Sequence, residues 1–371
     1  MPSRLFSPIS MGGRTLANRA VVSPMCQYSA IDGIPQAWHR QHLGSLMVGG
    51  PGAVILEATG VEAIGRITHG CLALHNDAQE AAFADLLADL RALGTGDIGI
   101  QLAHAGRKAS SRRPWEGGAP LAEDEDPWPI VGPSALPFDE GHPVPAELDA
   151  DGLARVKAAF VASAERAKRL GFDLVELHGA HGYLLHSFMS PLSNRRTDAY
   201  GGSLENRLRF PLEVAEAVRA VWPEDRILGM RITGTDWHED GSTIEDAVVL
   251  AKELERLGLD YVAVSSGGGA PGIRIKVGPG YQVPLAARVK QETGLAVMAV
   301  GMIVEPNQAE AILASGEADI LALARGFLDN PRWLWHAAEV LGDQAPYPPQ
   351  YARAEAKLWP GAALARPREV A

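Results

Sequence analysis

Short apolar runs alternate with longer helical patterns along most of the chain. Several of these runs are apolar nearly throughout, which is typical of parallel strands that are covered on both faces. Between them, apolar residues recur at i, i+3, i+4 and i+7, as at Phe83, Leu86, Leu87 and Leu90, and this spacing predicts helices. The predicted strands are Arg19–Pro24, Ala53–Ala58, Gly96–Gln101, Phe172–Leu177, Ile227–Ile232, Tyr261–Ser265, Ala296–Gly301 and Ile320–Ala324.

The alternation predicts an α/β fold with a parallel sheet. About eight strands is the number that a closed β/α barrel needs. We find no internal repeat and no clear domain boundary in the 371 residues. We therefore expect a single-domain (β/α)8 TIM barrel over residues 1–359.

Two segments depart from this alternation. Residues 114–149 are rich in Pro, Gly, Asp and Glu and show little periodicity, and a loop of this length is either a functional excursion or disordered. It follows the third predicted strand, at the end where barrels carry their active sites, so we interpret it as an excursion or lid on the active face. Residues 360–371 are predicted to form a disordered C-terminal tail.

Composition narrows the class of protein. The net charge of −11 argues against a nucleic-acid partner. No apolar run is long enough to span a bilayer, and the N-terminus lacks the apolar core of a signal peptide. The two cysteines provide neither a disulfide framework nor the ligands of an iron–sulfur cluster. We expect a soluble, cytoplasmic protein without a membrane partner.

The run from His178 to His186 holds the most informative polar residues. His178, His181 and Tyr183 follow the fourth predicted strand. Two ring N–H donors beside a tyrosine hydroxyl suit a site that holds a substrate oxygen and delivers a proton. The three histidines alternatively suggest a metal site, since histidine is a common ligand. The His-Glu-x-x-His spacing is missing, so we predict no metal and interpret His186 as structural.

Unusual residues also follow the other predicted strands. In β/α barrels such positions form the active face, and phosphate groups bind after the seventh and eighth strands. Gly301 can offer backbone N–H groups there, and Arg325 can make a bidentate phosphate contact. This phosphate site leaves open a second interpretation, a non-flavin barrel enzyme such as an aldolase or isomerase acting on a phosphorylated substrate. An aldolase would need a lysine inside the barrel, and we interpret Lys108 as a solvated surface charge.

The chain resembles the Old Yellow Enzyme family of FMN-dependent ene-reductases. The resemblance covers nearly the whole chain and rests on three motifs: Ser23-Pro-Met-Cys-Gln-Tyr28, Gln101-Leu-Ala-His-Ala-Gly-Arg-Lys108, and the block from His178 to Phe210. The chain has a His178/His181 pair where other members of the family have His and Asn, and it has Cys26 where others have Thr. In both features it resembles the subclass of xenobiotic reductase A and the thermophilic-like enzymes.

The resemblance implies a tightly bound FMN over the barrel mouth. Cys26 would tune the redox properties of the flavin through a weak S–H contact, and Arg231 would stabilise the negative charge of the reduced flavin. Gly301, Ala324 and Arg325 would hold the phosphate. The complete set of implied FMN contacts is Ser23, Pro24, Met25, Cys26, Ala58, Gln101, Arg231, Gly301, Ala324 and Arg325.

The resemblance also implies the reaction. NADPH or NADH would reduce FMN, which would then pass a hydride from N5 to an activated alkene (an enone, nitroalkene or maleimide) in a ping-pong cycle. His178 and His181 would hold the carbonyl or nitro oxygen with help from Tyr28, and Tyr183 would protonate the other carbon. The subclass forms homodimers or homotetramers in which the C-terminus can reach a neighbouring site, and Arg353 and Trp359 are the candidates here.

Overall fold

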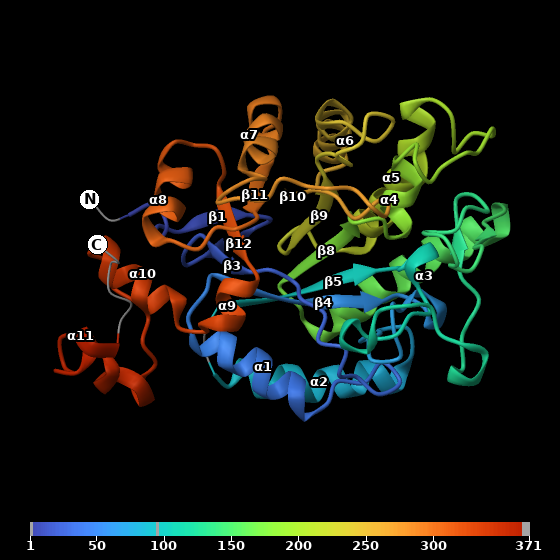
Figure 1. The fold of residues 1–371 in the computed structure, drawn as a ribbon. Coiled ribbons are helices and arrows are strands. Elements are labelled where there is room, and N and C mark those ends of the chain that lie inside the picture. The colour runs from blue at the N-terminus through green and yellow to red at the C-terminus, as the bar shows by residue number, and fades with distance from the viewer. Residues whose placement is uncertain (1–2, 94–95, 366–371) are drawn as a thin grey trace.

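The computed structural model describes residues 3–93 and 96–365. Eight parallel strands close into a barrel in the order β10-β11-β12-β3-β4-β5-β8-β9 (Figure 1). The barrel strands are β3 (Ala20–Val22), β4 (Ala53–Gly60), β5 (Asp97–Ala103), β8 (Leu174–Gly179), β9 (Ile227–Thr233), β10 (Tyr261–Ser265), β11 (Ala296–Val300) and β12 (Ile320–Leu323). Each corresponds to one predicted strand, so the predicted fold class is confirmed.

One predicted boundary needs correction at the site. Strand β8 ends at Gly179 rather than at Leu177, because it continues to pair with β9 through His178 and Arg231 and then through Gly179 and Ile232. His178 therefore belongs to the strand and not to the loop after it. In-register residues of neighbouring strands point to the same face of a sheet, so the pairing places His178 beside Arg231.

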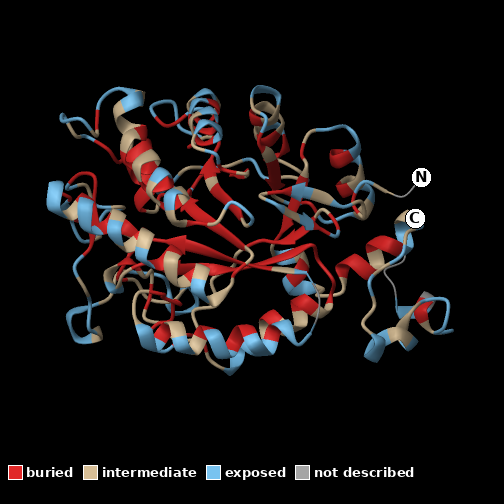
Figure 2. Cartoon of the chain, turned by 180° about the vertical axis from the view of Figure 1, so that it is seen from behind, coloured by how far each residue is buried: buried red, intermediate tan, exposed pale blue. Residues whose placement is uncertain are grey.

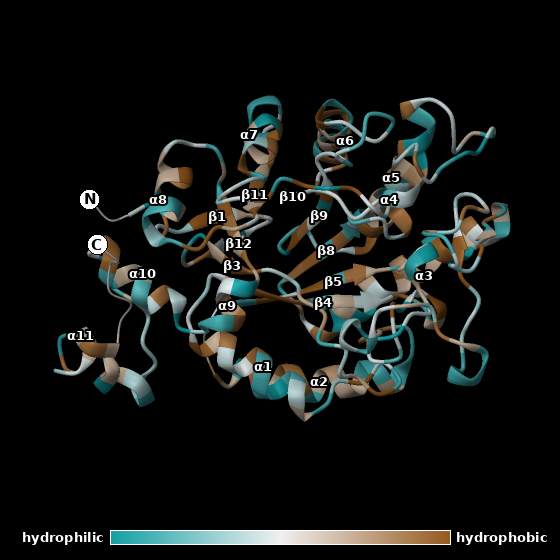
Figure 3. Ribbon diagram, in the orientation of Figure 1, coloured by the Kyte–Doolittle hydropathy of each residue, from teal (hydrophilic) through white to brown (hydrophobic). Residues whose placement is uncertain are grey.

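Helices surround the barrel and turn one apolar side toward it. Figure 2 shows the central strands almost wholly buried and the helices buried on their inner side only, and Figure 3 shows the strands as the most hydrophobic part of the chain. The predicted stripe of α2, from Phe83 to Leu90, is buried in the core. The helices that follow the strands are α1 (Ala37–Val48), α2 (Asp77–Arg91), α3 (Ala150–Leu170), α5 (Leu204–Val221), α6 (Ile244–Arg256), α7 (Val283–Glu292) and α8 (Pro306–Ala314).

An N-terminal hairpin covers one end of the barrel. Its strands are β1 (Ile9–Met11) and β2 (Arg14–Leu16). Gly12 at its turn approaches the backbone of Ile227, where β9 begins, and Arg14 forms ion pairs with Asp97 and Asp173 at the starts of β5 and β8. The hairpin thus covers the N-terminal ends of the strands, and their C-terminal ends lie at the opposite mouth.

The excursion of residues 114–149 folds against the barrel rather than being disordered. It contains the short helices η3 (Pro114–Glu116) and η4 (Glu123–Glu125) and the strands β6 (Val131–Gly132) and β7 (Ala146–Glu147). The Trp128 indole donates to the Ile64 carbonyl at 3.1 Å and packs edge-to-face on His69. These contacts attach the excursion to the loops that follow β4.

The C-terminal elements are α9 (Arg325–Asp329), α10 (Trp333–Leu341), η5 (Pro349–Ala354) and α11 (Ala362–Ala365). In Figure 1, α9 lies near β3 and β12, whereas α10 and α11 lie to one side of the barrel, with α10 below α8. Within the predicted tail, the four residues of α11 are helical, and residues 366–371 lie outside the described residues. None of the described helices is long and apolar enough to cross a membrane.

Candidate active site

Arg231 lies at the centre of the barrel mouth. Its guanidinium donates from Nε to the Ser265 hydroxyl at 3.2 Å and from Nη1 to the Ser23 hydroxyl at 3.1 Å. Both partners are uncharged, so these bonds hold the cation in place without neutralising it. The Ser265 hydroxyl also lies 2.9 Å from His181 Nε2. This series of hydrogen bonds connects the ends of β3, β9 and β10 to His181.

His178, His181 and Tyr183 come together as predicted. The His178 ring meets the ring of His181 at a centroid distance of 5.3 Å and that of Tyr183 at 4.8 Å, edge-to-face in both cases. His181 adopts a left-handed backbone with φ +59° and Gly182 follows at +77°. A Cβ at Gly182 would lie 2.3 Å from the Gly268 carbonyl oxygen. This sharp turn places His181 and Tyr183 beside His178.

The surroundings keep both imidazoles neutral. Burial, the Arg231 cation and the neighbouring Lys108 lower the pKa of His178 and His181 well below the ordinary histidine value. Nδ1 of His178 accepts the Ala180 N–H at 3.3 Å, which leaves the proton of this ring on Nε2. Burial also raises the pKa of Tyr183 well above its ordinary value. The site therefore contains two neutral imidazoles, each with one N–H group, and a phenol that retains its proton.

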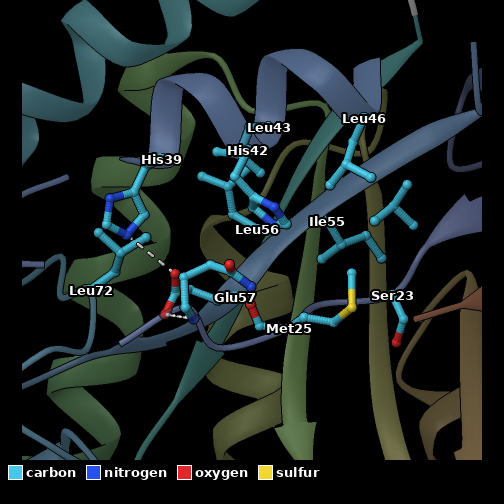
Figure 4. Close-up of a pocket in the computed structure, with 12 residues that line it drawn as sticks. Ser23, Met25, His39, His42, Leu43, Leu46, Ile55, Leu56, Glu57 and Leu72 are labelled. Atoms are coloured by element: carbon cyan, nitrogen blue, oxygen red, sulfur yellow. Dashed lines mark hydrogen bonds and ion pairs between the residues drawn. The ribbon is translucent and has the colours of Figure 1, made fainter. Parts of the chain in front are cut away.

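Two buried networks support the loops that carry the tyrosines. Under Tyr28, the Glu57 carboxylate accepts the Gln27 N–H at 3.0 Å and lies 3.3 Å from His39 Nε2 of α1, beside a small cavity (Figure 4). Tyr28 itself has φ +49°. Burial raises the pKa of Glu57, and it raises that of the Cys26 thiol, which lies against the Tyr28 hydroxyl. A thiol held protonated in this way suits a packing or tuning role better than that of a nucleophile.

Under Tyr183, His186 of α4 (Leu184–Met189) holds the turn from inside. Its Nδ1 accepts the Gly182 N–H at 2.8 Å, and its Nε2 lies 3.3 Å from Asp236 Oδ1. The second Asp236 oxygen accepts the Ser190 hydroxyl at 2.6 Å and the Ser242 N–H at 2.8 Å. His186 is therefore structural, as predicted. Within the described residues, no group of three potential ligands is arranged to hold a metal ion.

Lys108 is not the solvated surface charge that we predicted. Its ammonium donates to the carbonyls of His181 at 2.9 Å and Gly268 at 3.1 Å, and it lies 5.0 Å from the centre of the Tyr183 ring and 4.7 Å from that of Phe138. Burial and the neighbouring Arg107 lower the pKa of Lys108 to about 8. No local pattern predicts this position of Lys108, because it depends on contacts with the loops that follow β8 and β10.

The residues predicted to contact FMN surround the same mouth. Ser23 to Cys26 follow β3, Ala58 and Gln101 lie in β4 and β5, and Ala324 and Arg325 stand where α9 begins after β12. Gly301 follows β11 with φ +116°, and a Cβ there would lie 2.5 Å from the Gln282 amide. Arg353 and Trp359 are instead exposed, in and after η5, and neither belongs to a barrel strand or to a loop that directly follows one.

These features define a class of protein: a β/α-barrel oxidoreductase whose mouth suits a flavin. A part-buried arginine bonded to two hydroxyls, a glycine of positive φ after β11 and a helix start after β12 fit the ring and phosphate of FMN. The family profile described as the NADH:flavin oxidoreductase / NADH oxidase family matches residues 4–344. The chain belongs to this family, the flavoproteins of the Old Yellow Enzyme type, with FMN as cofactor and a nicotinamide as reductant.

Individual relatives agree with this membership. The chain is 44% identical over 355 residues to an NADPH dehydrogenase of Geobacillus thermodenitrificans, covering 95% of this chain and 99% of the relative. It is 42% identical over 354 residues to an NADPH dehydrogenase of Listeria innocua, again with 95% and 99% covered. Among solved structures, morphinone reductase is 30% identical with a TM-score of 0.75, covering 94% of this chain and 93% of that one. The alternative of a non-flavin barrel enzyme is thereby set aside.

Sequence reasoning assigned no role to four supporting residues. Glu57, Glu176 and Ser265 each contact a predicted site residue or the backbone beside one, and Asp236 contacts His186, which holds the turn at Gly182. A carboxylate inside an apolar strand, as at Glu57 and Glu176, is the only signal in the sequence that could have found two of them. Asp236 carries no such signal, because its partner lies 50 positions away in the chain and only the barrel brings the two together.

Proposed function

We propose that this protein reduces the C=C bond of activated alkenes such as enones, nitroalkenes and maleimides, with NADPH or NADH as the electron source. The observation that carries the proposal is the convergence of two neutral imidazoles and a protonated tyrosine at one strand end, beside an unneutralised arginine. Bound FMN, once reduced by the nicotinamide, supplies the hydride for one alkene carbon.

The residues of the chain then have separate tasks. His178 and His181 donate hydrogen bonds to the carbonyl or nitro oxygen, which polarises the double bond, and the Tyr28 hydroxyl adds a further donor. Tyr183 gives its proton to the second alkene carbon.

Other residues hold the flavin in this proposal. Gln101 bonds its polar rim, and Arg231 faces the region where reduction builds negative charge. Ser23, Pro24, Met25, Cys26 and Ala58 line its edge. Gly301, Ala324 and Arg325 hold the phosphate, because a glycine at positive φ and a helix start both present backbone N–H groups. Cys26 together with the His178/His181 pair favours the xenobiotic reductase A / thermophilic-like subclass.

Product analysis tests the function directly. The purified protein is incubated with NADPH and a panel of enones, nitroalkenes and maleimides, and the saturated products are quantified. We expect saturated products from several members, and a lower affinity for carbonyl and phenolic ligands in His178→Ala. Oxidation of NADPH without any saturated product would contradict the proposal.

A further inference from the structure

A carboxylate lies inside the barrel, one layer below the mouth. Glu176 of β8 is fully buried at 0% exposure and pairs in register with Gln101 of β5 and Gly229 of β9. Both of its oxygens accept a hydrogen bond: Oε1 from the Gln101 amide at 2.7 Å and Oε2 from the Tyr261 hydroxyl at 2.9 Å. A buried carboxylate is tolerated only when such partners offset its lost hydration.

The glycine at position 229 makes this arrangement possible. Tyr261 stands in β10, so its ring must cross β9 to reach Glu176 in β8. Gly229 lies on that path, paired with both residues, and a Cβ there would lie 2.1 Å from the Tyr261 ring. Because residue 229 of β9 is a glycine, the Tyr261 ring can reach Glu176; a side chain at this position would block it.

Arg231 follows Gly229 by two residues and thus points to the same interior face. The groups to which it donates, the Ser23 and Ser265 hydroxyls, are uncharged. Burial lowers the pKa of Arg231, and among the charges that counteract this effect Glu176 is the strongest. Burial raises the pKa of Glu176, and Arg231 is the strongest influence in the opposite direction. The two form a separated pair of opposite charges beneath the mouth.

We propose that Glu176 is the counter-charge of Arg231 and a positioning residue for Gln101, and that it thereby sets the reduction potential of the bound flavin. The proposal rests on the proposed contacts of Arg231 and Gln101 with FMN. Reduction adds negative charge to the flavin, which the Arg231 cation favours and a nearby carboxylate opposes. Because the Gln101 nitrogen is bound to Glu176, its amide oxygen is left to accept an N–H of the ligand.

The midpoint potential of FMN in the Glu176→Gln variant tests whether the negative charge of Glu176 affects the flavin. Glutamine keeps the size of the side chain and can still accept from Gln101, but it removes the charge. We expect a potential more positive than that of the wild type, measured in an anaerobic titration with a chemical reductant and a reference dye. Asp260→Asn is the matched control: it removes a carboxylate that accepts the Leu228 N–H at 2.8 Å, where β9 begins, and it should leave the potential unchanged.

A second variant, Glu176→Met, separates the positioning of Gln101 by Glu176 from the effect of the Glu176 charge. It should raise the potential in the same direction, and it should also weaken FMN binding relative to Glu176→Gln, because Gln101 then loses its acceptor. An unchanged or more negative potential in FMN-loaded Glu176→Gln would overturn the charge role, and equal FMN affinity in the two variants would overturn the positioning role. The titration needs no alkene, so a wild type that binds FMN but reduces no alkene would end the proposed function and leave this inference standing.

Discussion

Single side chains at the mouth are held in uncharged forms. Burial and the Arg231 cation keep the pKa of His178 and His181 well below the ordinary histidine value, whereas burial keeps the pKa of Tyr183 well above that of free tyrosine. Neutral imidazoles are weaker acids than imidazolium ions, so they can bind an oxygen without competing with Tyr183 for the role of proton donor. The division of tasks therefore depends on the environment of each ring.

Ligand binding should consequently depend little on pH near neutrality. Since the folded-state pKa of both histidines is lowered, they remain neutral throughout the range from about pH 6 to 7, which lies below the pKa of about 8 of the neighbouring Lys108. We expect the affinity for a neutral aldehyde or ketone, followed through the flavin absorbance, to be constant across this range. An affinity that changes with a midpoint near about 6.5, the ordinary histidine value, would show that the histidines titrate in the site.

Replacing Tyr183 by Phe should separate the two half-reactions. We expect reduction of the flavin by the nicotinamide to be retained, while reoxidation by an alkene slows by roughly 10²- to 10⁴-fold, the usual contribution of a positioned proton donor. Stopped-flow absorbance of each half-reaction provides the measurement. Tyr200→Phe is the control, because the Tyr200 hydroxyl contacts Glu213 at 3.2 Å outside the site. Equal losses in both half-reactions would contradict the assignment of Tyr183.

The grouping of His178, His181 and Tyr183 could be predicted from a short motif, because the three residues are neighbours in the chain. Lys108 was predicted wrongly and Asp236 was missed for the same physical reason. Their environments are made by loops from other strands, and no local pattern of the sequence records those contacts.

At the scale of elements, the loop between β8 and α4 is held by the buried pair of His186 and Asp236. Burial alone would raise the pKa of Asp236, but His186, the Ser190 hydroxyl and the Ser242 N–H together hold it well below the ordinary value. Apart from each other, His186 Nε2 and Asp236 Oδ1 have no polar partner among the described residues. The left-handed turn at His181 and Gly182 therefore depends on this pair.

Asp236→Ala should cost about 3 kcal/mol of unfolding free energy, because breaking a buried pair leaves the other member without its partner. Urea unfolding of the FMN-loaded protein gives this value. Asp89→Ala is a suitable control, since the ion pair of Asp89 with Arg40 joins two exposed side chains and such pairs contribute between about 0 and 1 kcal/mol. Equal stability of the two variants would mean that the pair does not hold the loop.

Element types followed from the sequence better than their ends. The apolar runs and helical stripes located every barrel strand, because burial on both faces imposes a continuous apolar pattern. The end of β8 was misplaced by two residues since polar His178 interrupts that pattern while the hydrogen bonding to β9 continues. The polar side chain of His178 thus hides the true end of β8 from a prediction that relies on apolar residues.

For the whole molecule, the count of apolar runs was enough to predict the closed barrel. The excursion of residues 114–149 could not be predicted as ordered, because it is held by individual contacts, such as that of Trp128 with Ile64, rather than by a periodic apolar face. The hairpin of β1 and β2 covers the N-terminal ends of the strands, and the candidate site lies at the opposite mouth.

Assembly is the remaining prediction at this scale. Arg353 and Trp359 are exposed and lie apart from the mouth of their own chain, and we propose that they reach the site of a neighbour in a homodimer or homotetramer. Arg353→Ala should then raise KM for the alkene while the rate of flavin reduction by a chemical reductant stays the same. Analytical ultracentrifugation that finds a monomer in the active, FMN-loaded protein would contradict this proposal.

The most direct test of the whole account is one anaerobic experiment on the purified, FMN-loaded protein. NADPH or NADH is added in stoichiometric amount and the flavin absorbance is followed, and an enone is then mixed with the reduced protein. We expect the yellow absorbance to be lost in the first step and to return in the second, with one equivalent of saturated product. A reduced protein that is reoxidised by oxygen but by no activated alkene would contradict it.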